Sequence, residues 1–163
     1  MRHAHSLGSK DPVFYKLFDL LKNYNDFSLD LLDTILDEAA KFSENELAPL
    51  YQSGDEEGCV LEDGVVTTPK GFKEAYSKFI EGGWTSLTGD IELGGQGLPS
   101  SVSLVVNEML TTANWAWAMY PGLSEGAVAT LESHGTDTQK KDYLGVNFWN
   151  ISCKKNCNKK TKW

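Results

Sequence analysis

The sequence predicts an all-α fold, an orthogonal or up-and-down bundle of about six helices with a small hairpin or long loop. Apolar residues recur at the three-and-four spacing of a helix in most segments, strand-like stretches are few, and glycine-rich stretches separate the helical patterns. With 163 residues, 40% of them apolar and 23% charged, the chain is large enough for one soluble domain with a core.

Two helices are expected in the first third of the chain. In residues 11–24, Pro12 suits the first turn of a helix whose apolar face carries Phe14, Leu17, Phe18 and Leu21. A second helix is expected within residues 28–50. It should begin after Ser28, an N-cap residue type, and stop before Pro49. Its apolar stripe consists of Leu32, Ile35, Leu36, Ala39, Phe42 and Leu47.

The middle of the chain is expected to hold a hairpin or ordered loop and then a third helix. Residues 51–69 contain three glycines, and Asp63-Gly64 separates two short apolar runs. Thr68 before Pro69 predicts the start of the next helix, which Gly82-Gly83 ends. Its inward residues are Phe72, Tyr76, Phe79 and Ile80.

Residues 82–101, GGWTSLTGDIELGGQGLPSS, are expected to form a loop because they hold six glycines. A phosphate-binding loop is one interpretation. However, Ser100 stands where the dinucleotide fingerprint has its third glycine, and no Gly-Lys-Ser/Thr ending follows. A structural turn is the favoured alternative.

The helical pattern then resumes. Residues 101–113 carry a broad apolar face made by Val102, Val105, Val106, Met109 and Leu110. After Pro121 the pattern continues through Leu123, Ala127 and Leu131 toward Gly135, a typical C-cap. Thr136 and Gln139 match a capping box, which predicts a last helix that ends near Leu144.

Charge narrows the range of partners. The net charge is −8, but the first 152 residues hold ten basic and 23 acidic residues, because five lysines lie in the tail. Such a body repels nucleic acid, and no apolar run approaches the roughly 20 residues of a membrane helix. Neither nucleic acid nor membrane is therefore expected as a partner. Three cysteines argue against a disulfide framework and favour a reducing, cytoplasmic location.

Few residues form a recognisable chemical motif, and no catalytic, metal-binding or cofactor-binding residue is predicted from the residues alone. His134 is explained as a helix-end residue near the negative end of the helix dipole. The acidic runs 55–57 and 62–63 lack EF-hand spacing. The aromatic residues of 115–120 could line an apolar pocket or fill a core, and both readings stay open.

Two long stretches resemble a known family. Residues 83–99, GWTSLTGDIELGGQGLP, and 107–144, NEMLTTANWAWAMYPGLSEGAVATLESHGTDTQKKDYL, resemble the N-terminal helical domain of FAD-dependent acyl-CoA dehydrogenases. Residues 31–76 are similar to the branch with an extended N-terminus, which includes 3-methylmercaptopropionyl-CoA dehydrogenases. The resemblance covers about residues 12–144.

The resemblance implies a role in the α,β-dehydrogenation of acyl-CoA thioesters, with FAD as the hydride acceptor. In the family, a flavin-binding β-barrel and a C-terminal bundle with the catalytic base follow this domain. The resemblance places five residues where the family lines its acyl-chain pocket. These are Trp117, Ala118, Tyr120, Pro121 and Gly122.

Three regions are therefore expected: a tag-like N-terminus at 1–11, the dehydrogenase N-terminal domain at 12–144, and a Lys/Asn-rich tail outside the family at 145–163. The expected interpretation is a truncated or frameshifted member that is inactive alone and binds no FAD itself. One alternative is half of a split dehydrogenase that a separate partner completes. Another is a non-catalytic binding module with a basic tail, and a homo-oligomer also stays open.

In the tail, CKKNCNKKTKW, two cysteines offer too few ligands for a structural zinc site. His3 and His5 at the other end are equally too few.

Overall fold

The computed structural model describes residues 28–144. Within them lie the helices α3 (Leu29–Phe42), α4 (Tyr51–Glu57), α5 (Phe72–Glu81), α6 (Ser100–Ala113), α7 (Trp115–His134) and α8 (Asp137–Tyr143), and the strands β1 (Val60–Glu62) and β2 (Val65–Thr67). The helix predicted at 11–24, the tag-like residues 1–11 and the tail at 145–163 lie outside the described residues. The all-α prediction is confirmed, since these elements are mostly helical and include one small hairpin.

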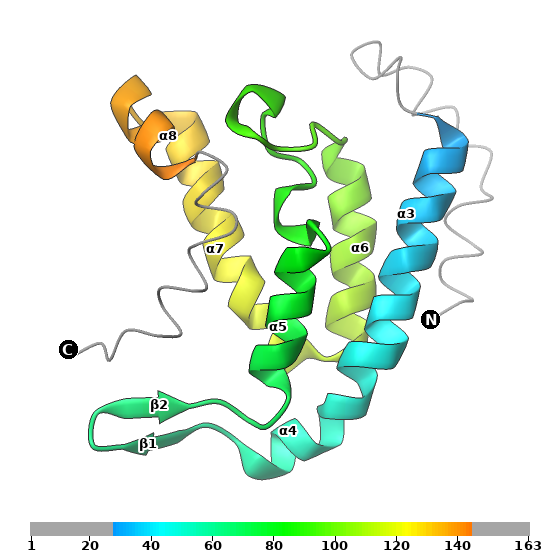
Figure 1. Ribbon diagram of the computed structural model, residues 1–163, viewed down its shortest axis with the longest axis vertical. Coiled ribbons are helices and arrows are strands. Elements are labelled where there is room, and N and C mark those ends of the chain that lie inside the picture. The colour runs from blue at the N-terminus through cyan, green and yellow to red at the C-terminus, as the bar shows by residue number, and fades with distance from the viewer. Residues whose placement is uncertain (1–27, 145–163) are drawn as a thin grey trace.

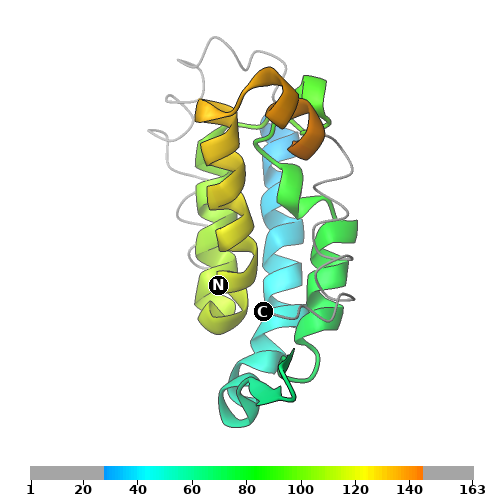
Figure 2. The ribbon, with the colours of Figure 1, turned by 90° about the vertical axis from the view of Figure 1, so that its left-hand side faces the viewer.

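Four helices stand side by side and alternate in direction. Following the colours of Figure 1, the chain descends in α3, rises in α5, descends in α6 and rises again in α7, while α8 turns across the end of α7. Figure 2 shows the same bundle from the side, with α6 and α7 together and α3 and α5 beside them. The hairpin extends away from the opposite end of the bundle.

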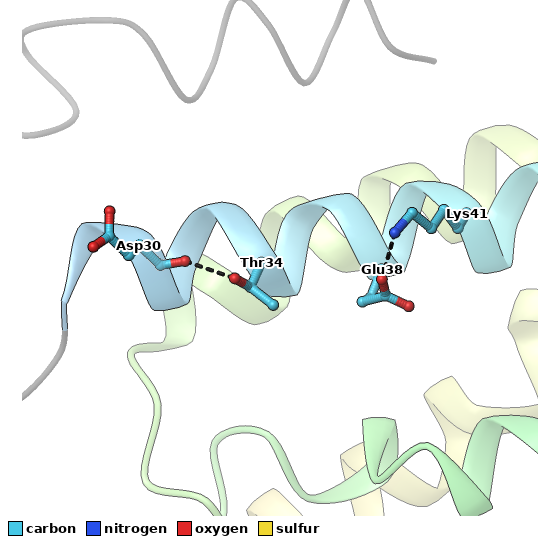
Figure 3. A network of polar contacts seen from close by, with 4 residues as sticks. All are labelled: Asp30, Thr34, Glu38 and Lys41. Carbon is cyan, nitrogen blue, oxygen red and sulfur yellow. Dashed lines mark hydrogen bonds and ion pairs between the residues drawn. The ribbon is translucent and has the colours of Figure 1, made fainter.

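α3 begins as the sequence predicts. The Ser28 hydroxyl accepts a hydrogen bond from the Leu31 amide at 3.1 Å, which satisfies one of the free amides of the first turn. Leu32 and Leu36 are buried, whereas the opposite face is polar. Figure 3 shows that face, where Thr34 donates to the Asp30 carbonyl and Lys41 pairs with Glu38 at 2.6 Å.

α3 stops before Pro49, as predicted, but it already ends at Phe42. After Phe42 the chain passes through a π-helical segment (Ser43–Leu47) and a 3-10 turn (Ala48–Leu50), and then enters α4. Pro49 lies within the first two residues of the 3-10 turn, where its missing N–H breaks no intrahelical bond. α4 was not predicted, because Gly54 made residues 51–57 look like a loop. Gly54 instead packs against the Phe72 ring, which leaves no room for a β-carbon.

The hairpin prediction is confirmed. β1 and β2 pair antiparallel, with Leu61 opposite Val66, and Asp63 and Gly64 form the turn with positive φ angles of 50° and 75°. α5, however, does not begin at Thr68. Its N-cap is Gly71, whose φ of 87° is closed to a helical interior, so the helix starts at Phe72. Its end at Gly82 agrees with the prediction.

One hydrophobic core joins α3, α5, α6 and the start of α7. Its largest buried side chain is Trp117, which is surrounded by aromatic rings from α3 and α5. The buried members include Leu32, Leu36, Leu47, Phe72, Phe79, Val102, Val106, Met109 and Leu110. This core fixes the inner face of α7 and therefore also decides which residues its outer face presents.

The capping predictions at the C-terminal end hold. α7 ends at His134 with Gly135 as its C-cap, and Thr136 and Gln139 form a reciprocal capping box at the start of α8. No helix among residues 28–144 is both long enough and apolar enough to cross a membrane.

Candidate functional site

The outer face of α7 is the candidate site, and a buried asparagine sets where α7 begins. Asn114 separates α6 from α7 in an extended conformation, with φ −159° and ψ 92°. Its side-chain oxygen accepts a hydrogen bond from the Trp117 amide at 3.0 Å, and its Nδ2 donates to the Leu47 carbonyl at 3.3 Å. One side chain therefore caps α7 and ties it to the π-helical segment.

Trp117 fixes the rotation of α7 about its axis. The indole is fully buried, and its Nε1 donates to the Phe72 carbonyl at 3.1 Å. Its ring meets Phe79 edge-on at a centroid distance of 5.4 Å and lies 6.0 Å from Phe42 and 5.9 Å from Tyr76. Because the indole N–H is hydrogen-bonded and the ring is packed among aromatic residues, this side of α7 faces the core. The opposite side of α7 therefore faces outward.

Tyr120 lies beside this core at the base of the hairpin. Its ring meets Phe72 edge-on at 6.1 Å, and its hydroxyl is 3.5 Å from the Cys59 sulfur. Burial, together with the hydrogen bond to Cys59, raises the pKa of Tyr120 to about 12. The phenol therefore stays protonated at neutral pH and joins α7 to the residue that precedes β1.

The outer side of α7 is apolar, uncharged and exposed. We call the face formed by Trp115, Met119, Gly122, Leu123 and Gly126 the open face of α7. Trp115, Met119 and Leu123 are exposed to 65%, 50% and 74%. A β-carbon placed at Gly122 or Gly126 would meet no atom within 4 Å. Large side chains thus flank two positions where the helix backbone itself is uncovered.

The five residues expected to line a pocket do not share one face. Trp117 and Pro121 are buried, Ala118 and Tyr120 are half-buried against the core, and Gly122 alone among them is on the open face. The helix continues after Pro121 as predicted, but Leu123 and Ala127, two residues of its apolar pattern, are exposed. The core side of this part of α7 is instead marked by Pro121 and Val128.

Sequence reasoning missed Met119 and Gly126 as members of the open face. The signal was available, since residues 115, 119, 122 and 126 follow the four-three-four spacing of one helical face. The run of small and aromatic residues in 113–122 hid it, because almost every position there is apolar and two faces of the helix look alike.

A polar pair borders the open face on the α6 side. Asn107 Nδ2 lies 3.3 Å from a carboxylate oxygen of Glu125 and 3.5 Å from the Ser103 hydroxyl. Burial raises the pKa of Glu125, and the hydrogen bond from Asn107 partly offsets that rise. The pair links α6 to α7 beside the uncovered glycines.

The glycine loop is held together by its own backbone amides. Each backbone amide from Gly95 to Leu98 already donates to a carbonyl of the same loop, at distances of 2.8 to 3.0 Å. The acceptors are Asp90, Ser86, Gly89 and Leu87. A β-carbon at Gly95 would lie 2.1 Å from the Gly89 backbone, so this glycine permits internal packing. The structural-turn interpretation therefore fits, because the amides of Gly95 to Leu98 already donate within the loop.

Metal chemistry finds no support in the described part of the chain. Between residues 28 and 144, no three His, Cys, Asp or Glu side chains gather in a way that could hold a metal ion. His134 lies exposed at the last position of α7, where a basic group suits the helix dipole.

Comparisons with known proteins agree on one family. Residues 31–146 match the family model for the acyl-CoA dehydrogenase N-terminal domain. The chain is 38% identical over 126 residues to the 3-methylmercaptopropionyl-CoA dehydrogenase of Ruegeria pomeroyi, an alignment that covers 77% of this chain and 21% of that protein. It is 30% identical over 151 residues to the broad-specificity linear acyl-CoA dehydrogenase FadE5 of Mycobacterium tuberculosis, which covers 86% of this chain and 24% of the relative.

A butyryl-CoA dehydrogenase of Syntrophomonas wolfei is 27% identical over 129 residues, which is 77% of this chain and 21% of that protein. The chain thus spans between a fifth and a quarter of the length of the curated relatives that it matches. Since the family model covers most of the chain and the bundle carries the expected helices, the chain belongs to the acyl-CoA dehydrogenase family, through its N-terminal domain.

Proposed function

We propose that residues 28–144 are the N-terminal helical domain of an FAD-dependent acyl-CoA dehydrogenase, in which the open face of α7 forms one wall of the acyl-chain pocket. The observation that carries this proposal is the open face itself. Three large apolar side chains and two uncovered glycines lie exposed and uncharged on one side of a helix whose other side is locked into the core. An exposed apolar patch of this kind marks a binding surface.

The geometry suits an extended acyl chain. Gly122 and Gly126 are one helical turn apart, so the uncovered backbone forms a shallow track, and Met119 and Leu123 border it. Methionine fills irregular apolar space well, which suits contact with methylene groups. In this proposal the residues of the open face bind the acyl chain, orient it and exclude water.

The flavin is assigned to other parts of the dehydrogenase. When bound, FAD accepts the hydride from the β-carbon after a base removes the α-proton. The glycine loop of this domain does not fit the phosphates of the cofactor, because its amides are already hydrogen-bonded within the loop. In this proposal residues 28–144 carry out no chemical step of the dehydrogenation. Their role is to position the substrate.

A hybrid enzyme tests this role. Residues 31–144 would replace the matching segment of the Ruegeria pomeroyi dehydrogenase, and dye reduction would be measured with acyl-CoAs of increasing chain length. Gly122→Leu and Gly126→Leu should each lower kcat/KM for long acyl chains by about tenfold or more relative to short ones, because leucine fills the track. Lys73→Leu, on an exposed part of α5, is the matched control. An unchanged chain-length profile in both glycine variants would refute the pocket wall.

A second measurement needs only this chain. Methyl labelling of methionine gives separate signals for Met119, which is half exposed, and Met109, which is buried in the core. Titration with hexanoyl-CoA should shift the Met119 methyl signal and leave Met109 unmoved. Free coenzyme A should leave both in place, since it lacks the acyl chain. Equal responses to the two compounds would contradict an acyl site.

The proposal also predicts how the purified chain behaves. It should carry no stoichiometric flavin and reduce no dye with acyl-CoA, because neither cofactor binding nor proton abstraction is assigned to its described residues. A stoichiometric flavin absorbance spectrum after purification would overturn this division of labour and would leave the acyl-wall assignment to be judged by the methionine titration.

A further inference from the structure

The hairpin presents apolar side chains on both faces. We call residues 51–67, which comprise α4 and the β1–β2 hairpin, the hairpin arm. Figure 1 shows the hairpin extending away from the helical bundle. Leu61 and Val66 pair across the strands and are exposed to 69% and 61%, and Val60 and Val65 are exposed on the other face. A lone two-stranded hairpin is marginally stable in water, so this one is expected to have a covering partner.

The base of the arm is held firmly. A carboxylate oxygen of Glu57 accepts a hydrogen bond from the Lys70 amide at 2.8 Å, and the Cys59 sulfur lies 3.5 Å from the Tyr120 hydroxyl. Gly54 packs directly on the Phe72 ring. The arm therefore leaves the bundle in a defined direction, and a partner would meet a preformed surface.

The arm is strongly acidic. Between residues 42 and 69 the chain contains no lysine, arginine or histidine. The acidic residues of the arm are Asp55, Glu56, Glu57, Glu62 and Asp63. Two of them, Glu62 and Asp63, belong to the hairpin itself, next to the exposed Leu61. A matching partner combines basic groups with apolar side chains.

We propose that the chain's own C-terminal segment, residues 145–163, docks on the hairpin arm. Its five lysines, Lys154, Lys155, Lys159, Lys160 and Lys162, are accompanied by no acidic residue. Positive groups would meet the acids of the arm while the methylene stems of these lysines cover Leu61 and Val66. Because the segment is tethered, it acts at an effective concentration in the millimolar range.

The length of the segment suits this contact. α7 begins near α4 at the end of the bundle that carries the arm, and it ends beside α8 at the other end. Its 20 residues span about 30 Å at 1.5 Å per residue. Residues 145–153, if extended, also span about 30 Å. Lys154 and Lys155, the first two lysines of the segment, come directly after these residues, so they can reach the arm.

A second copy of the chain is a poorer occupant. Residues 28–144 contain 20 acidic and six basic residues, so two such bodies repel one another. Antiparallel pairing of two hairpins would also bring acidic arms together. Charge complementarity instead favours the basic segment of the same chain.

Paramagnetic broadening tests the contact in the full chain. Cys59→Ser and Cys153→Ser leave Cys157 as the single thiol for a nitroxide label. The amide signals of residues 60–67 should lose most of their intensity at low salt and regain it in about 0.5 M NaCl, where charges are screened beyond a few ångströms. Broadening that is absent from these amides, or centred on α3, would overturn the proposal.

Two controls decide between sources of broadening. The same labelled chain with all five lysines of the segment changed to glutamine should lose the effect, whereas Lys140→Gln with Lys141→Gln in α8 should keep it. A mixture of isotope-labelled chain without nitroxide and unlabelled chain with nitroxide reports contacts between copies. Broadening of residues 60–67 in that mixture would assign the arm to a second copy and refute the intramolecular contact.

Discussion

The indole Nε1 of Trp117 donates a hydrogen bond to the backbone carbonyl of Phe72 across 3.1 Å. This bond joins the first turn of α7 to the first residue of α5, 45 positions earlier in the chain. Phe72 in turn packs on Gly54 of α4 and against the ring of Tyr120. Phe72 therefore connects the inner side of α7 with the base of the hairpin arm.

Trp117→Phe should destabilise the domain by about 1–3 kcal/mol, because it removes the indole donor to the Phe72 carbonyl and leaves part of a fully buried site unfilled. Urea unfolding followed by circular dichroism measures the change. Trp115→Phe is the matched control, since Trp115 is mostly exposed, and its effect should stay within about 0.5 kcal/mol. Similar losses for both variants would show that the Trp117 hydrogen bond contributes little.

Asn114→Ala should cost about 1–3 kcal/mol, because it removes the cap of α7 and the donor to the Leu47 carbonyl together. Asn114→Ser keeps a capping oxygen and loses the longer reach to Leu47, so its cost should be smaller. Thermal and urea unfolding can rank the two variants. Thr136→Ala at the exposed cap of α8 provides the reference for a cap alone, at about 1 kcal/mol. If Asn114→Ala cost no more than that reference, the bond to Leu47 would be unimportant.

Gly122→Ala and Gly126→Ala should each stabilise the isolated chain by about 0.5–1 kcal/mol, because alanine favours a helix and neither new methyl group meets an atom. Gly54→Ala is the opposite case, since its β-carbon would lie 2.6 Å from the Phe72 ring. Urea midpoints should therefore rise for the first two variants and fall for the third. A fall in all three would mean that the open face is covered in solution.

Glu125→Gln should flatten the dependence of stability on pH. Burial raises the pKa of Glu125 in the folded chain above its unfolded value near 4.5, so the folded state binds more protons between these two values. Stability then falls as the pH rises from about 4.5 through the folded pKa, and the loss persists at neutral pH. Glutamine keeps an oxygen for Asn107 without the charge. Unfolding free energies from pH 4 to 8 check this, and parallel curves for both chains would contradict it.

Local signals in the sequence were sufficient for most element boundaries. Ser28, the Asp63-Gly64 turn, Gly82 and the Thr136–Gln139 box act through bonds or dihedral angles within a few residues, so their residue types predict their positions. The prediction that a helix starts at Thr68 was wrong because Gly71 sets the turn before α5. The helical turn that carries the chain through Pro49 into α4 was not predicted, because a 3-10 turn accepts proline where an α-helix interior does not.

The sequence by itself determined an all-α domain, its hairpin and its family, because helical periodicity, caps and ordered motifs are properties of the chain read in order. The tertiary structure alone decided which face of α7 is open. Trp117 and Pro121 face the core while Met119, Gly122 and Leu123 face outward, since the rotation of α7 is set by partners far away in the chain, at Leu47 and Phe72. In a segment that is apolar nearly all round, periodicity cannot select a face, and packing against distant side chains does.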